Sequence, residues 1–134
     1  MTPFHLKIVT PDGLIFDGQA EELIVRTTGG DVAILARHIN YVAPLGMGRA
    51  VVVSGGQRRT AACIGGMLSV VDGEVTLVPT TFEWSDKIDL QRAEAAYQKA
   101  EQLLQNKDAS STDIRLAEAK LHRALVRKSV ASYK

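Results

Sequence analysis

The side chains best suited to chemistry lie towards the end of the chain. Arg123 and Arg127 are four residues apart, so in a helix they share one face. If this helix packs antiparallel against the one before it, its end lies beside Asp89 and Arg92. The polar set around this point is Glu83, Asp89, Arg92, Lys99, Arg123 and Arg127.

Two chemistries fit this polar set. One is a surface cluster of ion pairs worth about 0–1 kcal/mol each. The other is a site for a polyanion such as a nucleotide, held by several Arg forks. The pattern alone favours the surface cluster and leaves the nucleotide site open.

The sequence gives little support for catalysis by this chain alone. His5, His38 and His122 fall in an expected strand, loop and helix, and none has the spacing of metal ligands. Cys63, the only cysteine, falls within an expected strand and is interpreted as a buried, inert thiol. The sequence has no GxSxG, Walker or GxGxxG motif, so we expect no catalytic residue, no metal and no required cofactor.

Composition and charge narrow the class of partner. The 134 residues are 46% hydrophobic and 23% charged, which is typical of a soluble globular protein. Residues 1–85 carry a net charge of −2 and residues 86–134 a net charge of +3, so the second part suits an acidic partner. Interleaved aromatic residues are missing and the total charge is +1, which disfavours a nucleic-acid binder.

We expect no membrane span and no secretion signal. No run of 18 apolar residues is present, and no basic region precedes an apolar core at the N-terminus. A single cysteine suits a reducing cytoplasm. Any membrane association is therefore expected to depend on another subunit.

Up to Val78 the apolar residues recur at every second position, which predicts strands. Phe4, Leu6 and Ile8 are the clearest example. Paired glycines at 29–30, 55–56 and 65–66 are interpreted as hairpin turns. Residues 37–41 are expected to form an irregular loop. The pattern predicts an antiparallel β-sandwich or flattened barrel of eight to ten strands.

The architecture changes between Phe82 and Ala93, after which apolar residues recur at three and four. We expect a first helix from about Lys87, with Asp86 as its N-cap, and a second capped by Ser111 or Thr112. The predicted apolar stripes are Ala-rich: Ala93, Ala96, Tyr97, Ala100, Leu103 and Leu104, then Ile114, Ala117, Leu121, Ala124 and Leu125. The fold class is thus a two-part α+β chain, with a sandwich at 1–84 and a loosely held antiparallel helical hairpin at 85–134.

The order of these motifs resembles the epsilon subunit of the bacterial F-type ATP synthase. The resemblance depends on Val9 to Gly13, Phe16 to Gly18, Gly30-Asp31 with Ile34-Leu35 and His38, Gly65-Gly66, and Ile88 to Ala93, which matches an I/L-D-x-x-R-A motif. One segment departs from the family's G-I-L-P-x-H-x-P-L pattern, because residues 33–41 lack two prolines and a glycine.

The resemblance implies a non-catalytic rotor subunit on the cytoplasmic face of the plasma membrane. Its sandwich would bind the gamma subunit and sit on the c ring of a proton-driven synthase, with Asp31 and His38 facing that ring. Its hairpin would fold down, or extend to the alpha and beta catalytic subunits and inhibit ATP hydrolysis.

The resemblance also implies a regulatory nucleotide site, because some members bind ATP, with or without Mg²⁺, on the folded hairpin. The matching positions are Glu83, Ile88, Asp89, Arg92, Ala93, Lys99, Arg123 and Arg127. Lys99 stands where an ATP-binding member has Arg, and Lys lacks the fork. The alternative is a stand-alone nucleotide-binding sensor module, which predicts a soluble monomer without a membrane partner.

Overall fold

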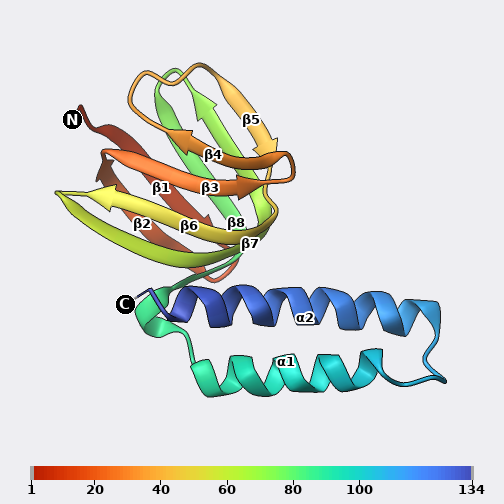
Figure 1. Ribbon diagram of the computed structural model, residues 1–134. Helices are drawn as coiled ribbons and strands as arrows, with labels where there is room; N and C mark the ends of the chain where they lie inside the picture. Colours follow the sequence, from red (N-terminus) through yellow and green to blue (C-terminus); the bar gives the residue numbers. More distant parts are fainter. Residues whose placement is uncertain (1, 134) are drawn as a thin grey trace. The chain divides into compact units, whose positions relative to one another are not determined.

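The computed structural model describes residues 2–133, and the chain forms two compact units, Met1–Trp84 and Ser85–Lys134. The first unit is built from strands and the second from helices (Figure 1). The strands are β1 (Phe4–Thr10), β2 (Gly13–Ala20), β3 (Glu22–Thr27), β4 (Gly30–Ile34), β5 (Tyr41–Pro44), β6 (Met47–Ser54), β7 (Gln57–Val71) and β8 (Glu74–Trp84).

The eight strands form a sandwich, which confirms the predicted fold class. They are hydrogen-bonded in the order β2-β1-β8-β7-β6-β3-β4, and β5 pairs with β7. The paired strands are antiparallel except β1 and β8, which run parallel, with Leu6 opposite Val75. The alternation in β1 is real, since Phe4, Leu6 and Ile8 are buried.

The prediction of a hairpin turn at Gly65-Gly66 is wrong. Both glycines lie inside the 15-residue strand β7, with φ of 68° and 102°. Before them β7 pairs with β6, and after them with β5. Ala61 and Cys63 face the core before this point, and Leu68 and Val70 after it. The glycines therefore let the strand change its core-facing side, and positive φ alone cannot distinguish such a bend from a turn.

Branched side chains fill the interior of the sandwich. Leu6, Ile8, Leu23, Ile34, Leu68 and Leu77 are the largest of its fully buried side chains. Full burial of such a side chain contributes about 1.5–3 kcal/mol, so this core can support a stable unit without a disulfide.

The second unit contains a 3₁₀ turn η1 (Ser85–Lys87), helix α1 (Leu90–Leu104) and helix α2 (Ser111–Ala131). The predicted start of the first helix is wrong by three residues. Asp89, rather than Asp86, is the N-cap, and its carboxylate accepts a hydrogen bond from the Arg92 N–H at 3.0 Å. The 3₁₀ turn contains the predicted N-cap, Asp86, and the predicted first helical residue, Lys87.

The predicted cap of the second helix, Ser111 or Thr112, is wrong by one or two residues. Ser110 caps α2 through a capping box, in which the Ser110 hydroxyl accepts from the Asp113 N–H and the Asp113 carboxylate accepts from the Ser110 N–H. Both contacts satisfy backbone donors that would otherwise be left open.

Alanine forms the regular part of the seam between α1 and α2. The buried alanines recur every seven residues: Ala93 and Ala100 on α1, then Ala117, Ala124 and Ala131 on α2. A seven-residue repeat keeps a narrow stripe facing the partner helix. The predicted stripes are too wide, because Ala96, Leu103, Ile114 and Leu125 are exposed.

Candidate functional site

The register of the two helices is marked by Lys128 near the end of α2. Its Nζ lies 3.1 Å from Glu94 Oε1 and 4.2 Å from the centroid of the Tyr97 ring, both on α1. The helices are therefore antiparallel, and the end of α2 lies beside the start of α1. The sequence analysis did not predict this contact.

This register places the predicted polar residues along the helix pair. Both helices rise about 1.5 Å per residue, so from Lys128 and Glu94 Arg127 is within about one turn of Arg92. Arg123 is level with Lys99 by the same reasoning. The prediction that both arginines lie near Asp89 therefore fits Arg127 better than Arg123.

The cationic side chains flank the alanine seam. Arg92 and Lys99 each precede a buried alanine of α1, and Arg123 precedes Ala124 of α2. Equivalent positions of two antiparallel helices are related by a twofold axis, so these three positions come to the same flank of the pair. Arg92 and Lys99 are exposed, whereas Arg123 and Arg127 are half-buried. This flank can present several cationic donors to one anion.

The remaining predicted residues have different environments. Asp89 is engaged as a helix cap, Ala93 is buried in the seam, and Ile88 is half-buried between η1 and α1. Glu83 belongs to the sandwich, where it is half-buried on β8 opposite Ala62.

Asp31 lies at the start of β4, next to the tight turn that joins β3 to β4. Arg26, directly opposite on β3, donates from Nε to Asp31 Oδ1 at 3.1 Å and from Nη2 to Oδ2 at 3.4 Å. The aliphatic stem of Arg26 passes over Gly48, where an added Cβ would lie 2.9 Å from the Arg26 Cβ. Sequence reasoning missed Arg26, although opposite charges across a hairpin are a recognised signal.

His38 lies in the irregular loop that follows β4. Its ring meets Tyr41 edge-on with centroids 5.8 Å apart, and its Nδ1 lies 2.8 Å from the Ile39 carbonyl oxygen. Asp31 and His38 are at opposite ends of β4, so the structure does not join them into one cluster (Figure 1).

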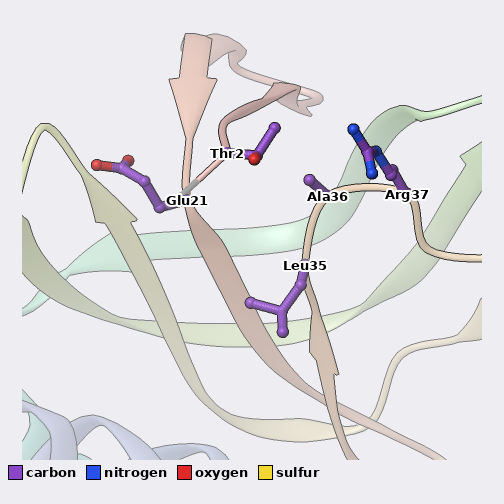
Figure 2. Close-up of a pocket in the computed structure, with 5 residues that line it drawn as sticks. All are labelled: Thr2, Glu21, Leu35, Ala36 and Arg37. Carbon is purple, nitrogen blue, oxygen red and sulfur yellow. The ribbon is translucent and has the colours of Figure 1, made fainter.

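A shallow pocket of about 240 Å³ adjoins this loop and is lined by Thr2, Glu21, Leu35, Ala36 and Arg37. Figure 2 shows the Glu21 carboxylate pointing away from Arg37. That carboxylate accepts from the backbone N–H groups of Gly55 and Gly56 at 3.1 and 3.2 Å. Among the described residues that line it, the pocket therefore offers an apolar wall and one guanidinium, without a second charge aimed into it.

Nothing in residues 2–133 points to a metal centre or a reactive thiol. No group of three or more His, Cys, Asp or Glu side chains in this range could hold a metal ion. Burial raises the pKa of the Cys63 thiol to about 12, so the thiolate is scarce at neutral pH. Across the same residues no helix is both long and apolar enough to cross a bilayer.

Comparison with known proteins identifies relatives over the whole chain. Residues 3–85 match the model of the ATP synthase delta/epsilon chain β-sandwich domain, and residues 86–132 match that of its long α-helix domain. The chain is 42% identical to an ATP synthase epsilon chain of Ruminococcus albus, with 100% of each chain covered. It is 43% identical to that of Bacillus velezensis, with 98% of each covered.

The fold also matches a solved structure. A chain in the Euglena gracilis mitochondrial ATP synthase assembly of OSCP, F1 and c-ring gives a TM-score of 0.84 at 20% identity. The match covers 100% of this chain and 83% of that one. Together with the two domain matches, these findings show that the chain belongs to the ATP synthase delta/epsilon chain family.

Proposed function

We propose that this chain is a non-catalytic subunit of the central stalk of a proton-driven F-type ATP synthase. The observation that carries the proposal is that each of its two compact units matches its own domain of one family, in the same order. The two bacterial relatives are epsilon chains aligned over 100% and 98% of their length. The subunit would be peripheral, held at the cytoplasmic face of the plasma membrane by the complex.

The sandwich is proposed as the rigid platform that docks to the gamma subunit and the c ring. Its closely packed core of branched side chains suits a part that must transmit torque without deforming. Asp31 and His38 are the proposed contacts to the ring. Arg26 would hold the Asp31 carboxylate in one orientation through its two-pronged contact.

The helical unit is proposed as a mobile arm that inhibits ATP hydrolysis when it extends towards the catalytic alpha and beta subunits. The support is its net charge of +3, which suits an acidic surface, and an alanine seam that buries little area. Because the two helices bury little apolar area, moving them to a new position would cost little free energy.

ATP is proposed as the ligand that stabilises the compact state of this arm. Arg92, Lys99 and Arg123 flank one side of the helix pair, with Arg127 close to the level of Arg92. Ligand at a hundredfold excess over its Kd would stabilise the state that binds it by about 2.7 kcal/mol. Low ATP would then release the arm and stop wasteful hydrolysis.

The inhibitory role is tested by adding the subunit back to a synthase from which it has been removed. We expect the full chain to lower ATP hydrolysis and a chain ending at Trp84 to bind without lowering it. Co-sedimentation with the complex is the control for binding. Equal hydrolysis with both chains contradicts inhibition by the arm, and no co-sedimentation of the full chain contradicts the stalk function and favours the free sensor module.

The ATP site is tested separately by calorimetry on the purified full chain. Arg92→Ala and Arg123→Ala are expected to lose most of the binding of ATP or Mg-ATP. Arg115→Ala is the matched control, because Arg115 is an exposed arginine on α2 outside the set. Absence of heat at millimolar nucleotide, or an equal loss in the Arg115 variant, overturns the site and leaves the stalk function intact.

A further inference from the structure

His5 on β1 lies between two carboxylates that come from two different strands. Its Nε2 is 2.6 Å from Asp17 Oδ1 on β2, and its Nδ1 is 2.6 Å from Glu74 Oε2 on β8. β2 and β8 are the two neighbours of β1 in the sheet. The imidazole therefore joins three strands on one face of the sandwich.

Only the protonated ring can make both contacts as hydrogen bonds. A carboxylate is an acceptor, so each ring nitrogen must carry a hydrogen to donate. Neutral imidazole has one N–H, and its other nitrogen would then direct a lone pair at a carboxylate. The protonation state of His5 thus determines whether the ring hydrogen-bonds to both β2 and β8 or to only one of them.

The other charge facing this group is Lys7, which is two residues from His5 on β1 and opposite Asp17 in the ladder. With the ring protonated, His5 and Lys7 balance Asp17 and Glu74. Hydrogen bonds to Asp17 and, to a smaller extent, to Glu74 raise the pKa of His5 above its ordinary value of 6.5. The hydrogen bond from His5, aided by the charges of His5 and Lys7, lowers the pKa of the Asp17 carboxyl.

We propose that His5 is a proton-operated clamp that holds β2 and β8 to β1 when the ring is charged and releases Glu74 when it is neutral. Asp17 is the carboxylate that stays, because it lies in the interior of β2 and has Lys7 opposite it in the ladder. Glu74 is the one that leaves, because its side chain is 65% exposed and it begins a strand directly after a turn.

Release of Glu74 acts on a turn that is tied to the loop before β5. The turn residue Asp72 donates its backbone N–H to Asn40 Oδ1 at 2.9 Å, and Asn40 is two residues from His38. The clamp therefore sets how firmly the start of β8 and the loop of His38 are held. It goes beyond the proposed stalk function and does not depend on it.

The direction of the pH effect follows from the raised pKa of His5. The clamp's contribution to stability is complete below the ordinary value of 6.5 and is lost as the pH rises through the folded pKa, which lies above it. The lowered pKa of Asp17 has its effect at acidic pH. The stability that the Asp17 carboxylate contributes is lost as the pH falls below 3.8, the ordinary pKa of this group.

The test is an NMR titration of the imidazole signals of the full chain. We expect His5 to titrate above 6.5, and the midpoint to fall in Asp17→Asn and in Glu74→Gln. Above the midpoint the ring nitrogen shifts should report the Nε2–H tautomer. Backbone protection factors at residues 72–74 and at Asn40, which correct for the rise of intrinsic exchange with pH, should then fall. In Glu74→Gln they should be low on both sides of the midpoint.

Three results would overturn the clamp. The first is a wild-type His5 that titrates at or below 6.5, which requires no variant. The second is a midpoint unchanged in both variants. The third is the Nδ1–H tautomer above the midpoint, which would mean that Asp17, rather than Glu74, is released.

Discussion

The two units of this chain are held together in different ways. In the sandwich, leucine, isoleucine and valine side chains are fully buried, among them Leu6, Leu68 and Leu77. In the helical unit the buried residues are mainly alanine and valine, while Leu90, Leu116 and Leu125 remain at least half exposed. Alanine buries little apolar area, so the helical unit depends more on its caps and on close helix contact.

The sandwich is therefore the more stable unit of the chain, and the helical unit is the more adaptable one. A rigid platform needs a closely packed interior, in which the loss of even one methylene group lowers stability. A moving element gains from a seam that can part without exposing a large apolar surface. We therefore expect substitutions in the sandwich core to cost more than substitutions in the helical unit. One pair of leucine variants tests this between the units, and three further pairs test single features within one unit.

The largest effect is expected for truncation of the sandwich core. Leu77→Ala removes a fully buried side chain and should lower the free energy of unfolding by about 2–5 kcal/mol. Leu116→Ala, at a leucine 54% exposed in the helical unit, should stay within about 0.5 kcal/mol. Urea denaturation measures both, and similar losses would contradict the comparison.

The second effect concerns the bend in β7. Gly66→Ala should cost at least about 1–3 kcal/mol of strain, because φ is 102°, and the new Cβ would also overlap the Val78 carbonyl. Gly73→Ala is the control, since its φ is 82° and nothing lies within 4 Å of its added Cβ. Thermal melting of both variants separates strain from overlap, and equal losses would show that overlap is unimportant.

The third effect tests the alanine seam. Ala124→Leu should force the helices apart and cost about 1–3 kcal/mol, confined to the helical unit. Ala96→Leu, at an exposed alanine of α1, should change little. Hydrogen exchange followed residue by residue distinguishes the units, and faster exchange in β7 or β8 of the Ala124 variant would mean that the two units unfold together.

The smallest effect concerns the start of α2. Ser110→Ala removes the capping box and should cost about 1 kcal/mol. Ser111→Ala changes one of the two residues that sequence reasoning named as possible caps, and should cost less. Circular dichroism during urea denaturation compares them, and the reverse order would restore the sequence-based assignment.

Much of the architecture could be predicted, because it follows from local periodicity. The alternation of Phe4, Leu6 and Ile8 and the change of period after Trp84 correctly indicate strands and then helices. The failures occur where two local signals conflict. Gly65-Gly66 has the composition of a turn, and Asp86 and Asp89 are both competent caps, so the choice depends on partners distant in sequence.

The candidate site divides in a similar way. The spacing of Arg123 and Arg127 predicted a shared helix face, but the contact of Lys128 with Glu94 and Tyr97 depends on the register of two helices. Arg26 became relevant to Asp31 only when the β3–β4 ladder placed them opposite each other. Side chains far apart in sequence meet only through such registers.

By itself the sequence determined the kinds of element, the boundary between the two parts and the family, because these depend on periodicity, turn residues and the order of motifs. Only the tertiary structure decided that His5 lies between Asp17 and Glu74, since residues 5, 17 and 74 meet through the pairing of β1 with both β2 and β8. The physical reason is that local preferences act over a few residues, whereas strand pairing and packing fix contacts between distant ones.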